Sequence, residues 1–319
     1  TATGMAAMTS AMLSIVKAGD HVVSSKTLFG SCRVFIEDIL PKFGVTSTLV
    51  DGEDNEAWKA AMQDNTTAVF LESPANPTLD VVDIQFVCDV AHENGAHVIV
   101  DNVFATPLLQ KPMQYGADIV IYSSTKHIDG QGRCLGGCIL TSEEIMEDTI
   151  LPYIRHTGPN MSPFNAWVML KGMETMDLRI DKMCSNAAIV ADGLKDLGVF
   201  SSVNYPGRTD FKQHELAMKQ MTAGGSVVTV FAPEGRDQAF KFLNALEVTD
   251  ISNNIGDAKS LMTHPASTTH KSVEESARLE MGITEGMLRL SVGLEHPDDL
   301  LEDFARAAKI AGLLNILRE

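Results

Sequence analysis

The sequence predicts an α/β fold, with a mostly parallel sheet covered by helices on both faces and a smaller α+β domain after it. Strand-like and helix-like segments alternate through the first half of the chain, and strands such as residues 68–71 (AVFL) and 97–100 (HVIV) are nearly continuous apolar runs. Such runs are typical of strands buried on both faces. Past residue 165 the alternation gives way to a long helical pattern, which predicts the second domain.

Local signals delimit the helices of the first half. Ala, Met and Leu favour a helix over residues 5–16, and the polar segment 17–20 ends it. Pro41 is expected to end the helix before it, and Gly95 closes the helix that begins at residue 81. The expected helices are residues 5–16, 34–40, 56–62 and 81–94, and the expected strands are residues 21–23, 45–50, 68–71, 97–100 and 118–122.

The second half predicts fewer strands and longer helices. Its expected elements are a largely helical region over 165–197, a glycine-led strand over 224–230, an alternating strand over 287–292 and a closing helix over 298–317. We therefore expect a large domain of residues 1–177 and a small C-terminal domain of residues 178–319.

Composition weighs against several classes of function. The 42 acidic residues exceed the 25 basic ones, and the formal charge of −17 disfavours nucleic acid or an anionic membrane as a partner. No run of 18 apolar residues indicates a membrane span. The 5 cysteines are odd in number and scattered, which is typical of reduced thiols in a cytoplasmic protein. Cys134 and Cys138 lack a second pair with zinc spacing, so we expect no metal site.

The start of the chain is unusual for a domain. The first residue is Thr1, no signal peptide is visible, and a helical pattern begins within a few residues. Because a domain rarely opens directly on a helix, we expect that an N-terminal segment is missing.

The main candidate site follows two apolar strands. Asp101 ends the first of these strands, and Ser123, Thr125 and Lys126 follow the second. Ligands of open α/β sheets bind at the carboxyl ends of strands, so we expect these side chains to face one ligand. A lysine that forms a Schiff base, hydroxyls that bind phosphate and an aspartate at a ring nitrogen are the layout that pyridoxal phosphate needs.

Other interpretations of these residues stay open. Asp101 could cap a helix, bind magnesium or hold a ribose, and Lys126 could be an ordinary surface lysine. A ribose-binding acid needs a glycine fingerprint between a strand and a helix. The only candidate, residues 130–136, precedes a strand-like segment instead, which disfavours a dinucleotide site.

Five further residues are candidates. Gly4 and Met5 open a helix, where free N–H groups can bind an anion, although a simple glycine cap is the plainer interpretation. Phe29 lies in a loop and could be a core aromatic, and Asn76 lies in a proline-rich turn. Arg289 alternates with apolar residues in a strand and either faces an anion or points to solvent.

Taken together, the motifs resemble the cystathionine-synthase/lyase group of pyridoxal-phosphate enzymes of sulfur amino-acid metabolism. Five segments carry the resemblance in chain order: residues 3–7 (TGMAA), 72–77 (ESPANP), 100–102 (VDN), 123–126 (SSTK) and 289–295 (RLSVGLE). The resemblance covers essentially the whole chain and implies the aspartate-aminotransferase-like fold of fold-type I enzymes.

Within this family, residues 129–133, 158–167 and 28–31 are similar to the O-succinylhomoserine sulfhydrylases. Phe29 stands where most relatives carry a tyrosine, so ring stacking is kept and the phenol is lost. Ser31 stands where methionine γ-lyases carry a cysteine, which weighs against that activity.

The resemblance implies a role for each candidate. Lys126 would form the Schiff base and move the Cα proton, Asp101 would hold the ring nitrogen protonated, and Phe29 would stack on the ring. Asn76 would contact the cofactor 3′-oxygen and the substrate, and Arg289 would bind the substrate α-carboxylate. The phosphate would be bound by Gly4, Met5, Ser123 and Thr125. Arg33 or Arg133 could supply the charge that a succinyl group needs.

The implied reaction is γ-replacement, in which an O-succinyl- or O-acetylhomoserine and sulfide give homocysteine and a carboxylate. Cystathionine γ-synthase, with cysteine as nucleophile, and a γ- or β-lyase are the alternatives in the same class. An inactive cofactor-binding fragment is the alternative of another class, because relatives carry an N-terminal segment that supplies a tyrosine and an arginine to a neighbouring subunit. The resemblance also implies a homotetramer built of dimers.

Overall fold

The structure, a computed structural model, describes residues 1–313 and divides into two compact units. The first unit comprises Thr1–Asn76, Asp80–Asp129 and Arg133–Lys171, and the second comprises Pro77–Leu79, Gly130–Gly132 and the described residues from Gly172 onward. The division falls near the end of α8 (Pro163–Met173). The expected domain limit, between residues 177 and 178, falls in the first turn of α9 (Met176–Leu197) and stays a prediction.

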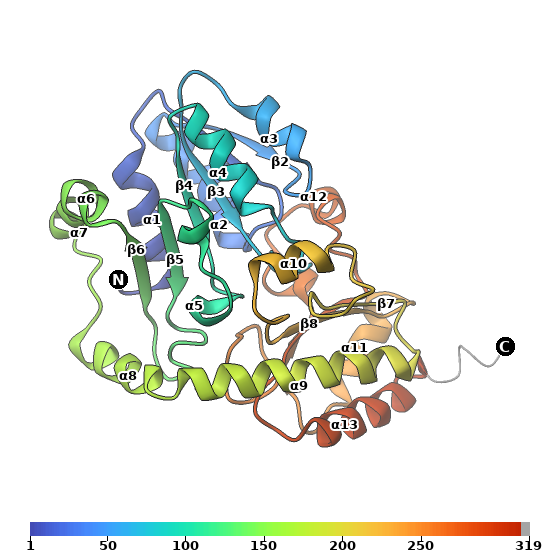
Figure 1. The fold of residues 1–319 in the computed structure, drawn as a ribbon. Helices are drawn as coiled ribbons and strands as arrows, with labels where there is room; N and C mark the ends of the chain where they lie inside the picture. The colour runs from blue at the N-terminus through green and yellow to red at the C-terminus, as the bar shows by residue number, and fades with distance from the viewer. Residues whose placement is uncertain (314–319) are drawn as a thin grey trace. The chain divides into compact units, whose positions relative to one another are not determined.

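The first unit is built on a six-stranded sheet in the order β2-β1-β3-β4-β5-β6 (Figure 1). Its strands are β1 (His21–Ser25), β2 (Thr46–Val50), β3 (Thr66–Glu72), β4 (His97–Asp101), β5 (Ile119–Ser123) and β6 (Gly137–Thr141). The first five run parallel and β6 runs antiparallel to β5, so the mostly parallel sheet expected from the sequence is confirmed.

Successive side chains along each strand point to opposite faces of the sheet, and both faces are buried. In β4, Val98 and Val100 pack in one apolar cluster with residues of α3 and α4, whereas Ile99 packs in another with residues of α1 and α2. Both faces are therefore covered, as near-continuous apolar strands require.

The four expected helices of the first unit are present with shifted bounds, and the helical segments over 106–115 and 143–157 were not expected. Its helical elements are α1 (Gly4–Ile15), α2 (Gly30–Val34), η1 (Phe35–Ile39), η2 (Leu40–Phe43), α3 (Asn55–Ala61), α4 (Ile84–Glu93), α5 (Thr106–Leu109), η3 (Pro112–Tyr115), α6 (Glu143–Ile145), η4 (Met146–Ile150) and α7 (Leu151–Thr157). The expected helix over 34–40 was wrong at both ends, because the run begins at Gly30 and continues past Pro41. Pro41 opens a 3₁₀ turn, where its missing N–H leaves no bond unmade.

The second unit contains a five-stranded sheet in the order β7-β8-β11-β10-β9 and is α+β, as expected. Its elements are α9 (Met176–Leu197), β7 (Ser202–Asn204), α10 (His214–Gln220), β8 (Val227–Phe231), α11 (Arg236–Asn244), β9 (Asp250–Ile251), β10 (Leu261–Thr263), η5 (Pro265–Ser267), α12 (Glu275–Glu280), β11 (Met287–Ser291) and α13 (Pro297–Ile310).

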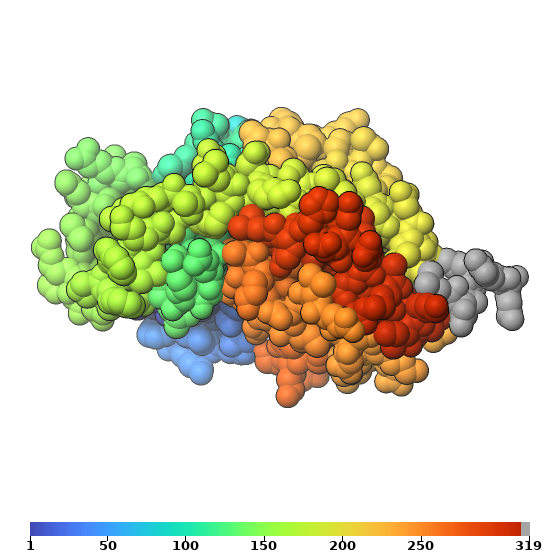
Figure 2. All heavy atoms as spheres, turned by 90° about the horizontal axis from the view of Figure 1, so that it is seen from below, coloured from blue at the N-terminus to red at the C-terminus, as the bar shows by residue number. Residues whose placement is uncertain are grey.

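Helices α9 and α13 bury apolar faces in one cluster of the second unit, and α13 is seen in red on the face drawn in Figure 2. The closing helix was expected over 298–317, but α13 ends at Ile310. The last part of that expectation, residues 314–317, lies outside the described residues. Within residues 1–313, no helix is long and apolar enough to cross a membrane.

Candidate active site

Three adjacent strands of the first unit end with polar side chains on the same face of the sheet. Glu72 at the end of β3 is the register partner of Asp101 at the end of β4. Asp101 pairs with Ile121 of β5, and Ser123 lies two residues further along that strand, so it shares the face. This is the face covered by α1 and α2, because Ile99 and Ile121 belong to the cluster that contains residues of both helices.

The N-terminus of α1 lies directly against the end of β5. A Cβ atom built on Gly4 would lie 2.6 Å from Cβ and 2.7 Å from Oγ of Ser123. Thr3 caps the helix, because its hydroxyl accepts a hydrogen bond from the N–H of Ala6 at 2.9 Å. The first N–H groups of a helix have no acceptor within the helix, so this end offers donors beside the Ser123 hydroxyl.

Gly4 is expected to tolerate no side chain, because a Cβ there would lie within 2.9 Å of the backbone of Ser123. We expect Gly4→Ala to lower the free energy of unfolding by about 1–3 kcal/mol, measured by chemical denaturation. Ser14→Ala, at the other end of the same helix, is the control and should change stability by less than about 0.5 kcal/mol. Equal stability of Gly4→Ala and the unsubstituted protein would contradict the close approach.

Thr125 and Lys126 lie in the turn that follows β5. The Thr125 hydroxyl accepts the N–H of Gly136 at 3.1 Å and donates to its carbonyl at 3.3 Å, which ties the turn to the segment before β6. The N–H of Lys126 donates to the carbonyl of Ser123 at 3.1 Å. Lys126 is half-buried, so it is less exposed than an ordinary surface lysine.

Asp101 is a buried carboxylate at the centre of this face. One oxygen accepts the N–H of Val103 at 3.0 Å. Burial raises the pKa of Asp101 to about 7, and the hydrogen bond from Val103 offsets only part of that rise. A cation close to Asp101 would favour its ionised form, so the carboxylate is suited to a protonated ring nitrogen.

A buried network holds the segment that follows Asp101. The side-chain amide of Asn102 donates to the Tyr122 hydroxyl at 2.9 Å and to the carbonyl of Gln110 at 3.0 Å. Gln110 in turn donates to the carbonyl of Ser73 at 2.7 Å. These bonds connect the ends of β3, β4 and β5 and therefore fix where Asp101 lies.

Phe29 and Asn76 are brought to this region by a residue to which we assigned no role from the sequence. The two carboxylate oxygens of Glu72 accept the N–H groups of Phe29 and Asn76, each at 2.8 Å. The signal was present, since Glu72 ends an apolar strand as Asp101 does. Asn76 is buried, and Phe29 is partly buried against the cluster of α1 and α2.

Arg289 belongs to the second unit. It lies in β11 between Leu288 and Leu290, which face the core of that unit. Its guanidinium donates to the carbonyls of Asn253 at 2.8 Å and Asn254 at 3.4 Å. Arg289 is buried, so the interpretation as a solvent-facing arginine was wrong.

The two arginines considered for a succinyl group are both paired with carboxylates. Arg33 donates from Nε to Glu37 at 2.7 Å. Arg133 donates from Nε to the buried Asp129 at 2.9 Å, and its backbone N–H donates to the same carboxylate at 2.7 Å. Each guanidinium is thus partly neutralised, which weakens the case for either as a lone receptor for a distal carboxylate.

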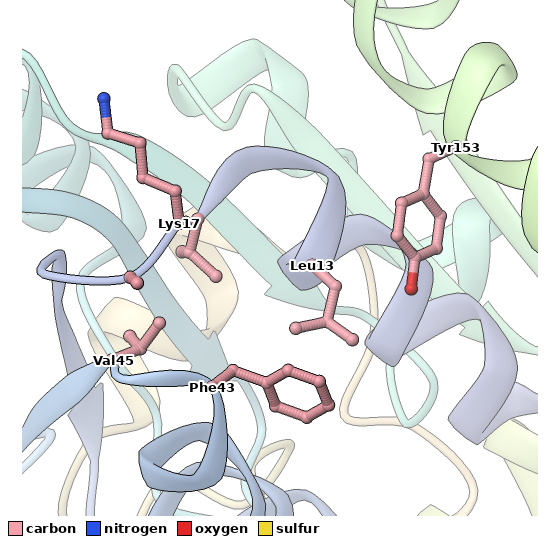
Figure 3. Close-up of a pocket in the computed structure, with 7 residues that line it drawn as sticks. Leu13, Lys17, Phe43, Val45 and Tyr153 are labelled. Atoms are coloured by element: carbon pink, nitrogen blue, oxygen red, sulfur yellow. The ribbon is translucent and has the colours of Figure 1, made fainter.

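A separate apolar hollow of about 250 Å³ lies at the other end of α1 (Figure 3). Its lining residues are Leu13, Val16, Lys17, Ala18, Phe43, Val45 and Tyr153. In Figure 3 the amino group of Lys17 points away from the apolar side chains. Leu13 lies nine positions after Gly4, about 14 Å along the helix axis, so this hollow is distinct from the candidate site.

The residues of the first unit fit pyridoxal phosphate. Helix N–H groups beside Ser123 suit a phosphate, the poorly solvated Asp101 suits a ring cation, and Lys126 offers an amine in the adjoining turn. A lysine, an aspartate and a helix N-terminus near the carboxyl ends of parallel strands are the groups that a pyridoxal-phosphate-dependent enzyme needs.

Comparison with known proteins identifies the family. The family model described as Cys/Met metabolism PLP-dependent enzyme matches residues 1–309, and the chain belongs to this family. Its cofactor is therefore pyridoxal phosphate, and its activity is that of a transferase or lyase of cysteine and methionine metabolism.

Particular relatives carry different activities. An O-succinylhomoserine sulfhydrylase of Mycobacterium tuberculosis is 47% identical over 96% of this chain and 77% of its own length. An L-methionine gamma-lyase of Porphyromonas gingivalis is 39% identical over 94% of this chain and 76% of its own length. The crystal structure of a cystathionine gamma synthase from Xanthomonas oryzae, in complex with aminoacrylate and cysteine, superposes with a TM-score of 0.95 at 30% identity, covering 98% of this chain and 81% of that one. The fold-type I architecture expected from the sequence is confirmed.

Proposed function

We propose that this protein catalyses γ-replacement, converting an O-acylhomoserine and sulfide into homocysteine and the carboxylate of the acyl group. The observation that carries the proposal is the arrangement of Gly4, Ser123, Lys126 and Asp101 at the carboxyl end of one sheet. The identity of 47% to a sulfhydrylase, against 39% to a methionine lyase, favours replacement over elimination. Ser31, where methionine γ-lyases carry a cysteine, favours it too.

Pyridoxal phosphate, when bound, supplies the electron sink that makes the α-proton of an amino acid acidic. Asp101 holds a proton at the ring nitrogen, and Lys126 removes the proton at Cα and returns one later. The Phe29 ring stacks on the cofactor and excludes water from that side, but it offers no hydroxyl. Lys126 therefore does proton transfer that a tyrosine at position 29 could share.

The remaining candidates bind and orient. The N–H groups of Gly4 and Met5 and the hydroxyls of Ser123 and Thr125 bind the phosphate. Asn76 contacts the cofactor 3′-oxygen and the substrate. Arg289 binds the substrate α-carboxylate by two parallel hydrogen bonds, a geometry that suits a guanidinium. These assignments, like the homotetramer and the cytoplasmic location, are parts of the proposal.

The test is an assay of products. The protein is loaded with pyridoxal phosphate, given O-succinylhomoserine or O-acetylhomoserine, and offered sulfide and cysteine in separate reactions. Homocysteine with sulfide, and little cystathionine with cysteine, is the expected result. Cystathionine as the main product would identify a cystathionine γ-synthase. Formation of 2-oxobutanoate without homocysteine or cystathionine would identify a lyase. Absence of any product from a protein that binds the cofactor would indicate an inactive binding fragment.

A further inference from the structure

Glu72 makes two hydrogen bonds that join distant parts of the first unit. Its Oε2 accepts the N–H of Phe29, which lies 43 residues away in the chain, at 2.8 Å. Its Oε1 accepts the N–H of Asn76 at 2.8 Å. One carboxylate thus bridges the residue before α2 and the turn that follows β3.

Glu72 is buried, so its carboxylate needs hydrogen-bond donors. Its side chain is 3% exposed, and a buried carboxylate is costly unless hydrogen bonds compensate it. Bonds from N–H groups to an ionised acceptor are short and strong, in agreement with the two distances of 2.8 Å. A glutamine could accept only one of them with its oxygen, because its amide nitrogen is a donor and would face the other N–H.

Glu72 also lies close to the centre of the site. It is the register partner of Asp101 in the adjacent strand, and side chains at paired positions point to the same face. Burial is the main cause that raises the pKa of the Cys32 thiol, and the negative charges of Asp101 and Glu72 raise it further. The two carboxylates therefore both lie close enough to Cys32 to interact with it electrostatically.

We propose that Glu72 is a positioning residue that sets where Phe29 and Asn76 lie relative to each other. The inference rests on the proposed function, which places the Phe29 ring and the Asn76 side chain against the same cofactor. Glu72 touches neither the substrate nor the cofactor in this proposal. Its carboxylate acts through two backbone N–H groups and so fixes the two side chains that those segments carry.

The central experiment replaces Glu72 by glutamine, which keeps the size and removes one acceptor. Two properties are measured: the dissociation constant for pyridoxal phosphate, by absorbance titration, and the visible circular dichroism of the bound cofactor, which depends on how its ring is held. We expect the dissociation constant to rise about tenfold or more and the dichroism to weaken. Glu72→Asp, which keeps the charge on a shorter side chain, should recover part of both signals.

Asp83→Asn is the matched control. Asp83 also accepts a backbone N–H, from Phe86 at 3.2 Å, but it caps α4 on the opposite face of the sheet. Its replacement should leave the dissociation constant and the dichroism within about twofold. Equal changes in the Asp83 and Glu72 variants would mean that general stability, not positioning, explains the effect and would overturn the proposal.

A double-mutant cycle with Phe29→Ala separates positioning from structure. Removal of the ring leaves the backbone N–H of residue 29 in place, so the bond to Glu72 can still form. If Glu72 acts through the ring, Glu72→Gln should weaken cofactor binding less in the Phe29→Ala background than in the native one. Strictly additive changes would contradict the inference.

Failure of the proposed function is recognised separately. If the unsubstituted protein does not bind pyridoxal phosphate, the function fails and takes the inference with it. If it binds, and Glu72→Gln binds with the same affinity and dichroism, the inference alone fails. Should Glu72→Gln not fold, amide hydrogen exchange of the unsubstituted protein decides. Cofactor binding is expected to slow exchange at Phe29 and Asn76 together, and unchanged exchange at both would overturn the inference.

Discussion

Replacing Lys126 by alanine is expected to abolish turnover, with a loss of at least about 10³-fold in kcat. The residue has two roles in the proposed reaction, since its amine holds the cofactor covalently and moves the Cα proton. Loss of one general base alone costs about 10²–10⁴-fold, and loss of the covalent link adds to that. The measurement is the initial rate of homocysteine formation, together with the absorbance of the bound cofactor.

The fold should survive the Lys126→Ala substitution. Lys126 is half-buried in a turn, and the hydrogen bond that its backbone makes to Ser123 does not depend on the side chain. Circular dichroism in the far ultraviolet should therefore match that of the unsubstituted protein. Lys59→Ala is the control, because the Lys59 amine pairs with Glu56 on an exposed surface. Turnover near the native rate in the Lys126 variant would refute the assignment of the site.

The first sheet could be predicted from sequence because its strands carry a strong local signal. Runs such as residues 97–100 and 118–122 are apolar on both faces, and each is bounded by a helix or a turn. The helix around Pro41 could not be delimited in the same way. A proline usually stops a helix, but here it lies at the start of a new turn, where tertiary packing of Phe35 and Leu40 keeps the chain helical.

The parts of the candidate site that lie at strand ends could be predicted from the sequence. Asp101 and Ser123 follow apolar strands, and parallel strands bring such ends to one edge. Glu72 ends a strand in the same way, but the bonds that give it a role join it to Phe29, which lies far away in sequence. No local sequence pattern predicts a hydrogen bond between residues so far apart in the chain. The close approach of Gly4 to Ser123 likewise depends on how α1 packs on the sheet.

Replacing Asp101 by asparagine is expected to lower activity and to raise the stability of the cofactor-free protein. The loss in kcat should be about 10²–10³-fold, since the substitution removes the charge that stabilises a protonated ring nitrogen. The gain in stability has a different origin. Burial raises the pKa of Asp101 from 3.8 to about 7, so the folded protein opposes ionisation of this carboxyl.

The sign of the pH dependence follows from proton binding. Between about pH 4 and pH 7 the native carboxyl keeps a proton that the unfolded chain has released, so the stability of the unsubstituted protein falls as pH rises through this range. The amide side chain of the variant does not titrate. The Asp101→Asn protein should therefore gain up to about 4 kcal/mol relative to the unsubstituted protein by pH 8, and close to nothing at pH 3.

Chemical denaturation at pH 3 and pH 8 without cofactor measures this difference, and Asp118→Asn is a control of opposite sign. Burial alone would raise the pKa of Asp118, but the nearby His97 imidazole and the hydrogen bonds from the N–H of Val98 and from His92 lower it to about 2. Its replacement should destabilise the protein more at pH 8 than at pH 3.

Saturation with pyridoxal phosphate provides the final test, because a ring cation beside Asp101 offsets the burial of its charge. The cofactor should therefore stabilise the unsubstituted protein more than the Asp101→Asn protein. If the two proteins gain equally from the cofactor, Asp101 does not face the ring nitrogen. If the unsubstituted protein gains more, the carboxylate of Asp101 destabilises the cofactor-free protein because its position is suited to a cationic ring.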